Sequence, residues 1–247
     1  KKLGGERDGV PVGVSIGLKP TDEELHEAVA GYLEDGYARV KLKIKPGRDV
    51  EMLAGLRERF PDTLFMADAN SAYRLEDSDR LREMDALNLT MIEQPLRYDD
   101  FLEHARLQER IETPVCLDES IKGEGDLALA LELGSCRIVN IKPGRVGGFG
   151  VSSRIHDTMR AAGLPVWCGG MLESGVGRAH NLALASLPGF TLPGDISASQ
   201  RYWSQDIVTP EFEVEDGVMK VPTGPGLGVE LDLDRIHGLT VREAEFG

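Results

Sequence analysis

The stretch TMIEQPL, residues 90–96, starts as a buried apolar strand and ends with Glu93 and Gln94 in front of a proline. A carboxylate at the end of an apolar strand needs a compensating partner, because burying an unpaired charge costs several kcal/mol. Other candidate strands end in the same way. The charged strand ends are Lys43, Asp68, Glu93, Asp118 and Lys142, separated by 25, 25, 25 and 24 residues. This step is the length of one strand plus one helix, so it predicts that the five side chains share one rim of a parallel sheet.

Working outward from this stretch, eight short β-branched or apolar runs alternate with amphipathic segments. The runs cover residues 11–18, 38–44, 64–70, 90–96, 114–120, 137–143, 165–170 and 191–197. Alternating strands and helices imply a parallel sheet, and eight strands favour a closed TIM-type barrel of the (β/α)7β kind. No GxGxxG follows the first strand, which weakens the alternative of a Rossmann-type open sheet.

The alternating pattern stops after residue 198. The segment 212–222 is typical of a hairpin that turns at Asp216-Gly217, and the segment 222–232 is rich in glycine and proline. We therefore expect an α/β barrel over residues 1–198 and an irregular C-terminal extension over 199–247 that packs on the barrel.

The composition limits the partners of this chain. There are 28 Lys and Arg against 42 Asp and Glu, a formal net charge of −14, which argues against nucleic acid or an anionic membrane as a partner. No run of 18 apolar residues and no signal peptide is present. The three cysteines are widely separated, which predicts buried, reduced thiols and a cytoplasmic location.

The strand VKLKI, residues 40–44, shows which way its lysines point. Val40 and Leu42 share one face of the strand, and Lys41 and Lys43 share the other. In an ordinary sheet such lysines would face solvent. In a parallel barrel, one strand face is covered by helices and the other points into the lumen, so Lys41 and Lys43 are expected to point inward.

The three acidic strand ends, Asp68, Glu93 and Asp118, have two interpretations. They can form ion pairs with the lysines of the same rim, Asp68 with Lys43 and Glu93 with Lys142. Alternatively, they can hold a divalent cation. Carboxylates without His or Cys neighbours are the ligands of a hard cation, which favours Mg²⁺, with Mn²⁺ or another divalent cation as a substitute.

With a cation in place, Lys43 and Lys142 become candidates for proton transfer. They come from the second and sixth strands, on opposite sides of the barrel. A substrate carboxylate between them would present its α-carbon to both amines. Lowering a lysine pKa from 10.4 to about 7.5 costs roughly 4 kcal/mol, and neighbouring positive charge such as that of Lys41 can supply part of it.

Five ordered motifs together resemble the enolase superfamily, specifically its muconate-lactonizing subgroup. These motifs are KLK (41–43), DAN (68–70), EQP (93–95), DES (118–120) and NIKPGRVGG (140–148). Within the subgroup, GGMLESGVGRA (169–179) and GPGLGVELD (224–232) are most similar to N-acylamino acid racemases and o-succinylbenzoate synthases. The resemblance covers nearly the whole chain.

The resemblance implies roles for particular residues and a small-molecule carboxylate substrate. Lys43 and Lys142 would be the acid/base pair, with Lys41 supporting Lys43, and Asp68, Glu93 and Asp118 would bind Mg²⁺. The residues implied to contact or orient the substrate are Ser15, Asn70, Glu119, Gly170, Met171 and Leu172. Barrels of this kind commonly assemble, so we also expect a homo-oligomer.

Two departures from the family pattern qualify these expectations. Dipeptide epimerases of the subgroup have Asp-x-Asp after the last strand, whereas GDISAS here has only Asp195, which disfavours a free-amine substrate. Family members also have an N-terminal capping domain over the barrel mouth, and we expect it to be missing from this chain, which starts with Lys1. A muconate cycloisomerase-like lyase and a non-catalytic barrel with salt-bridged rim charges remain as alternatives.

Overall fold

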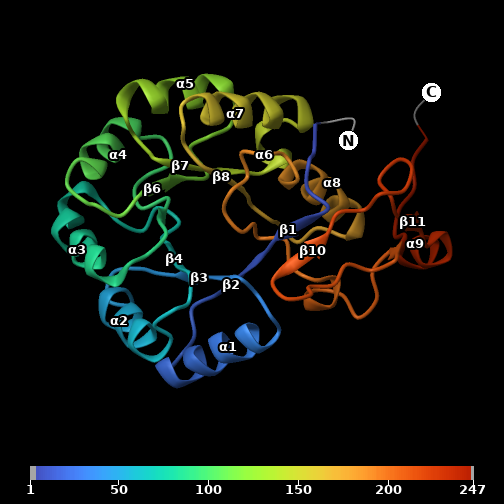
Figure 1. Ribbon diagram of the computed structural model, residues 1–247, viewed down its shortest axis with the longest axis horizontal. Coiled ribbons are helices and arrows are strands. Elements are labelled where there is room, and N and C mark those ends of the chain that lie inside the picture. Colours follow the sequence, from blue (N-terminus) through green and yellow to red (C-terminus); the bar gives the residue numbers. More distant parts are fainter. Residues whose placement is uncertain (1–3, 246–247) are drawn as a thin grey trace.

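The computed structural model describes residues 4–245, and its centre is a seven-stranded parallel sheet in the order β2-β3-β4-β5-β6-β7-β8 (Figure 1). Its strands are β2 (Gly13–Ile16), β3 (Arg39–Lys43), β4 (Phe65–Asp68), β5 (Ile92–Glu93), β6 (Val115–Leu117), β7 (Ile138–Ile141) and β8 (Val166–Cys168). Neighbours along the chain are neighbours in the sheet, as repeated strand–helix units require. The predicted parallel barrel is confirmed.

The eighth predicted strand, residues 191–197, is not a regular strand. An extended segment nevertheless closes the ring, because Phe190 pairs with Val166 of β8 on one side and Gly194 pairs with Val12, next to β2, on the other. The Gly13 N–H also donates to the Gly194 carbonyl at 2.7 Å. Pro193 lacks the backbone N–H that a continuous ladder needs, which explains why the pairing is limited to isolated bridges.

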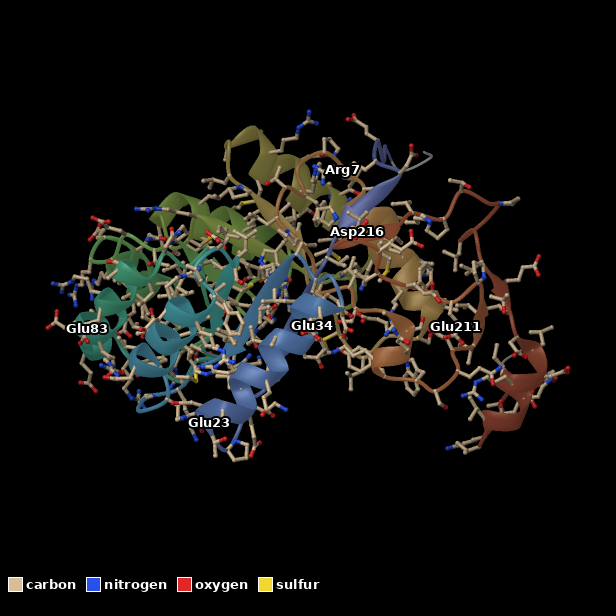
Figure 2. All side chains as sticks on the ribbon, turned by 60° about the horizontal axis from the view of Figure 1, so that its bottom comes forward. Arg7, Glu23, Glu34, Glu83, Glu211 and Asp216 are labelled. Carbon is tan, nitrogen blue, oxygen red and sulfur yellow. The ribbon has the colours of Figure 1, made fainter. Side chains whose placement is uncertain are left out.

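The helices lie around the outside of the ring, in chain order (Figure 1). They are α1 (Asp22–Glu34), α2 (Val50–Arg59), α3 (Ser78–Glu83), α4 (Phe101–Gln108), α5 (Glu124–Leu133), α6 (Pro143–Val146), α7 (Phe149–Ala161) and α8 (Gly175–Ala185), with 3-10 turns η1 (Leu75–Asp77), η2 (Met84–Leu87) and η3 (Ser199–Arg201). Thr21 caps α1 by accepting from the Glu24 N–H at 3.2 Å. Figure 2 shows Glu23 and Glu34 at the two ends of this helix.

The two faces of each barrel strand have different surroundings. Val40 and Leu42 of β3 belong to the large core between the sheet and the helices. Inside the barrel, a separate apolar cluster consists of Met66, Met91, Cys116, Ile138 and Trp167. Its members lie two residues before Asp68, Glu93, Asp118, Asn140 and Gly169, so by strand alternation they form the layer below these residues. Trp167 is therefore a packing residue, and the rim groups lie above this apolar cluster.

The C-terminal part of the chain forms two short antiparallel pairs, one with an N-terminal strand and one within itself. β10 (Val218–Lys220) pairs with β1 (Gly9–Pro11), and β11 (Glu230–Leu231), which precedes α9 (Leu233–Leu239), pairs with β9 (Val208–Thr209). The predicted turn is present, since Glu215 and Val218 pair across Asp216 and Gly217, both with positive φ. Figure 2 shows Asp216 near the paired strands β1 and β10.

Two of the expectations drawn from composition can be checked on the fold. Cys116, Cys136 and Cys168 are free and buried, as predicted. Within residues 4–245, no helix has the length and apolar composition needed to cross a bilayer.

A buried ion pair anchors α8 to the segment that follows the barrel. Asp206 accepts from the Gly175 N–H at 2.7 Å and from Ser199 Oγ at 2.6 Å, and it lies 3.3 Å from Arg178, with both charged side chains at most 2% exposed. We expect Asp206→Ala to lower the free energy of unfolding by about 3 kcal/mol, because the buried guanidinium loses its partner. Thermal unfolding followed by circular dichroism measures this, and Glu215→Ala, which breaks the exposed pair with Lys220, should leave the melting temperature unchanged.

The same pair predicts a pH dependence of stability. Burial alone would raise the pKa of Asp206, but the hydrogen bonds from Ser199, Gly175 and Ile207 and the charge of Arg178 together lower it. A carboxyl whose pKa is lower in the folded state stabilises the fold above the unfolded value of about 3.9 and loses this contribution as the pH falls through the folded value. The stability difference between wild type and Asp206→Ala should therefore be constant above about pH 5 and shrink below about pH 4. A difference that stays constant to pH 3 would contradict this.

Candidate active site

The register of the sheet brings the predicted charged residues to one rim. Lys43 pairs with Asp68 between β3 and β4, and Asp68 pairs with Glu93 between β4 and β5. Asp118 directly follows β6, and Lys142 directly follows β7. Because β3 and β7 are four positions apart in a ring of eight, Lys43 and Lys142 come from opposite sides of the barrel.

Lys41 lies at the centre of the acidic groups. Its Nζ is 3.1 Å from Glu93, 3.3 Å from Asp68 and 2.7 Å from Asp195. Burial would lower the pKa of Lys41, but the charges of these three carboxylates outweigh burial and raise the pKa well above its ordinary value. Lys41 is therefore a fixed positive charge, which suits a supporting role better than proton transfer.

Asp68 is shared by two lysines. Lys43 Nζ is 2.6 Å from its carboxylate and also contacts the Asn70 side chain, which in turn donates to Glu119 Oε1 at 3.0 Å. Burial would raise the pKa of Asp68, but the nearby ammonium groups of Lys41 and Lys43 lower it. Asn70 and Glu119, which the resemblance implies contact or orient the substrate, thus form a hydrogen-bonded chain that ends at Lys43.

Glu93 is the most deeply buried of the carboxylates, with no exposed surface. It accepts a hydrogen bond from Asn140 Nδ2 at 2.7 Å in addition to its contact with Lys41. Burial raises its pKa to about 8, and the charges of Asp68 and Asp118 add to the effect while Lys41 opposes it. The positive charge of the nearby lysines therefore does not fully offset the cost of a charged Glu93 carboxylate.

The Asp118 carboxylate is bound by two positively charged side chains, Lys142 and Arg145. Lys142 Nζ is 2.6 Å from the carboxylate, and Arg145 Nη1 also contacts it. Arg145 is itself fixed by the Ile121 and Asn140 carbonyls. Of the ion pairs considered from the sequence, Asp68 with Lys43 is present. The pair of Glu93 with Lys142 is wrong, because Glu93 pairs with the more deeply placed Lys41 and Lys142 pairs with the adjacent Asp118.

The fit of these residues to a divalent cation rests on their chemistry and their common rim. Three carboxylates on consecutive strands supply only hard oxygen donors, and Glu93 has no exposed surface, so a nearby cation would stabilise its charged form. Among residues 4–245, no three His, Cys, Asp or Glu side chains stand in an arrangement that could hold a metal ion directly. Both oxygens of Asp118 are bound by Lys142 and Arg145, which would compete with a cation for this carboxylate.

The other predicted substrate residues lie around this rim with different degrees of exposure. Ser15 lies within β2, opposite Lys41 in the register, and not at the end of the strand. Met171 and Leu172 are 64% and 71% exposed, and their role as pocket residues remains a prediction. Gly170 has a structural requirement of its own, since a Cβ there would lie 1.9 Å from the Asp195 carbonyl.

Several residues of the site were not singled out from the sequence. Asn140 precedes Lys142 by two residues on the same strand face, and this spacing could have indicated its contact with Glu93. Arg145 is in a quoted motif but its contact with Asp118 depends on a helical turn after β7. Gly169 is also needed, because a Cβ there would lie 2.7 Å from the Lys142 side chain and closer still to Asn140.

Residues 24–235 match the family model described as enolase C-terminal domain-like. The chain belongs to the enolase superfamily. The match covers the barrel from α1 onward and most of the C-terminal extension, and it confirms the resemblance found in the sequence motifs.

Relatives within this superfamily are more than half identical to the chain. An o-succinylbenzoate synthase of Geobacillus stearothermophilus is 54% identical over 238 residues, which are 96% of this chain and 64% of the relative. An N-succinylamino acid racemase of Thermus thermophilus is 53% identical over 239 residues, 97% of this chain and 65% of the relative. The chain thus spans slightly less than two thirds of the length of these curated relatives.

Solved structures of the superfamily have the same fold. An enolase-superfamily member from Listeria innocua is 48% identical with a TM-score of 0.93, over 96% of this chain and 64% of that chain. A muconate cycloisomerase from Pseudomonas fluorescens has a TM-score of 0.89 at 23% identity, over 96% of this chain and 67% of that chain, and so shows the fold alone.

Proposed function

We propose that this protein removes a proton α to a carboxylate, with Lys43 and Lys142 as the acid/base pair and Asp68, Glu93 and Asp118 as ligands of Mg²⁺. The observation that carries the proposal is the placement of the two lysines. They project from opposite strands of one barrel, and each ends 2.6 Å from a different carboxylate of the same acidic row.

The proposed cation agrees with the superfamily and with the local charges. Enolase-superfamily sites use a lysine or histidine base together with Mg²⁺. When bound, the ion would stabilise the negative charge that develops on the substrate carboxylate as the α-proton leaves. Mn²⁺ or another divalent cation has the same preference for oxygen ligands and is a suitable probe.

The lysines would carry the proton transfer from two sides. A substrate whose α-carbon lies between Lys43 and Lys142 can lose its proton to one amine and receive a proton from the other, which inverts its configuration. The same pair can serve a dehydration if one amine removes the α-proton and then donates it to the departing hydroxide, which leaves as water, while the other amine stabilises charge. Lys41, locked among three carboxylates, keeps a positive charge next to Lys43 in both cases.

The identified relatives suggest two small-molecule carboxylates as substrates. N-succinylamino acid racemase and o-succinylbenzoate synthase are the names of relatives that are 53% and 54% identical to this chain. We propose one or both of these activities, that is, racemisation of an N-acylamino acid and the dehydration that gives o-succinylbenzoate in menaquinone biosynthesis. Asp195 is bound to Arg39 and Lys41, so it is not free to hold a substrate ammonium group, which favours acylated amines.

Product analysis separates the two activities. The protein with Mg²⁺ would be incubated with N-succinyl-L-amino acids and, separately, with the precursor of o-succinylbenzoate. Polarimetry would follow racemisation, and absorbance of the aromatic product would follow dehydration. Turnover in either assay that stops on chelation supports the proposal. Conversion of muconate alone would favour the cycloisomerase alternative, and the absence of any metal-dependent turnover would favour a barrel with structural ion pairs.

A further inference from the structure

Gln94 occupies a position in the site that the proposed chemistry does not use. It follows Glu93 at the end of β5 and has no exposed surface. Its φ is +42°, in the left-handed region that is sterically unfavourable for a residue with a Cβ. A strained, buried polar residue next to a candidate ligand indicates that the surrounding structure holds it there for a reason.

The side-chain amide of Gln94 is bonded at both ends to the neighbouring strand end. Its Oε1 accepts from the backbone N–H of Asp118 at 3.0 Å and from that of Ser120 at 3.2 Å. Its Nε2 donates to Ser120 Oγ at 2.8 Å and to the Leu96 carbonyl at 3.3 Å. One amide thus fixes the backbone on both sides of Glu119.

The backbone of Gln94 connects the same region to the strands on either side. Its N–H donates to the Cys116 carbonyl of β6 at 2.8 Å, and its carbonyl accepts from the Ser71 N–H at 2.7 Å. Ser71 follows Asn70 just beyond β4, and both also have positive φ. Gln94 therefore touches the ends of all three strands from which Asp68, Glu93 and Asp118 project.

We propose that Gln94 is a positioning residue that sets the backbone of Asp118 relative to Glu93 and so fixes the spacing of the carboxylates for a divalent cation. This inference rests on the proposed function, because it assigns Gln94 to the same cation site. In this role Gln94 contacts neither the cation nor the substrate and acts through its hydrogen bond to the Asp118 backbone.

The chemistry of the amide explains why glutamine suits this position. An apolar side chain of similar size would leave the buried N–H groups of Asp118 and Ser120 without an acceptor. A glutamate would add a third buried negative charge beside Glu93 and Asp118, and it would lose the donors to Leu96 and Ser120. Only a neutral amide supplies an acceptor for two N–H groups and donors for two oxygens here.

The chain offers a matched control at the other end of β6. Gln108 is also buried, and its Oε1 accepts from the Val115 N–H at 2.7 Å while its Nε2 faces the Ile111 and Thr113 carbonyls at 3.4 and 3.3 Å. It thus fixes the start of the strand whose end Gln94 fixes. Gln94→Met and Gln108→Met each remove a buried amide that binds the backbone of β6, one next to the proposed cation site and one away from it.

The test is the dissociation constant of Mn²⁺, measured by electron paramagnetic resonance on wild type and both variants, with thermal unfolding to verify folding. Gln94→Met should weaken Mn²⁺ binding about 10- to 100-fold, the range found when groups that orient metal ligands are lost. Gln108→Met should bind Mn²⁺ like wild type, although it loses a similar amount of stability. Hydrogen exchange should also accelerate at residues 118–120 in Gln94→Met alone.

The outcomes distinguish the proposed function from the proposed role of Gln94. Wild-type protein that does not bind Mn²⁺ would overturn the proposed function and this inference with it. If wild type binds and Gln94→Met binds equally well, or if Gln108→Met weakens binding as much, this inference alone is wrong. Should Gln94→Met fail to fold, Ser120→Ala decides, because it removes the hydroxyl that orients the amide. It is expected to weaken binding at least about threefold, and unchanged binding overturns the inference.

Discussion

Replacing either Lys43 or Lys142 with alanine should lower the racemisation rate of an N-succinylamino acid by roughly 100- to 10,000-fold, the usual contribution of a positioned acid or base. The two lysines come from opposite sides of the barrel, so inversion needs both. Each variant keeps one amine, however. We therefore expect each to exchange the α-proton of one enantiomer only, and the two variants to act on opposite enantiomers.

Proton NMR in D₂O with each pure enantiomer measures this pattern. Lys45 is a suitable control because it is exposed just two residues beyond Lys43, and Lys45→Ala should racemise like wild type. If both variants lose racemisation but exchange the α-proton of the same enantiomer, the two amines act on one side of the substrate. This result would contradict the assignment of Lys43 and Lys142 to opposite sides. Unchanged racemisation in either variant would exclude that lysine from the reaction.

Glu93→Gln should abolish metal-dependent turnover while leaving the protein about as stable as wild type. Burial raises the pKa of Glu93, so its charged form is costly without a cation, and glutamine has nearly the same shape without the charge. A cation, in contrast, needs the charged carboxylate. Mn²⁺ binding should therefore weaken at least about 100-fold, more than the loss of a group that only orients a ligand.

Two measurements on the same sample check this prediction. Thermal unfolding at pH 7 without metal should give nearly equal midpoints for wild type and Glu93→Gln, and a Mn²⁺ titration should separate them. A variant that binds Mn²⁺ as tightly as wild type would remove Glu93 from the ligand set. If Glu93→Gln instead unfolds, the fold needs the charged form of Glu93 as a partner of Lys41. That result would contradict the raised pKa of Glu93.

The positions of the rim residues follow from the sequence because they depend on regular structure. A repeat of 24 or 25 residues places Asp68, Glu93 and Asp118 on successive strands, and strand alternation turns Lys41 and Lys43 into the barrel. Both properties depend on backbone periodicity alone. For that reason the barrel, its strand order and the shared rim agree with expectation.

The ion-pair and hydrogen-bond partners of the rim residues could not be predicted from the sequence, because they depend on side-chain conformation and on irregular backbone. Lys41 binds Asp195, which lies on the segment that replaces a regular eighth strand. Arg145 reaches Asp118 from a short helix after β7, and Gln94 adopts a left-handed φ that no local pattern indicates. Such contacts are determined by tertiary packing, which overrides local preferences.

In the proposed mechanism, three carboxylates and two opposed lysines form one metal-dependent site for α-proton transfer. Deuterium incorporation at the α-carbon of both enantiomers of an N-succinylamino acid, followed by NMR in D₂O with Mg²⁺ and again with excess chelator, tests it most directly. Both enantiomers should exchange with Mg²⁺, and neither should exchange with chelator. Exchange that persists undiminished without metal, or no exchange of either enantiomer with Mg²⁺, would contradict it.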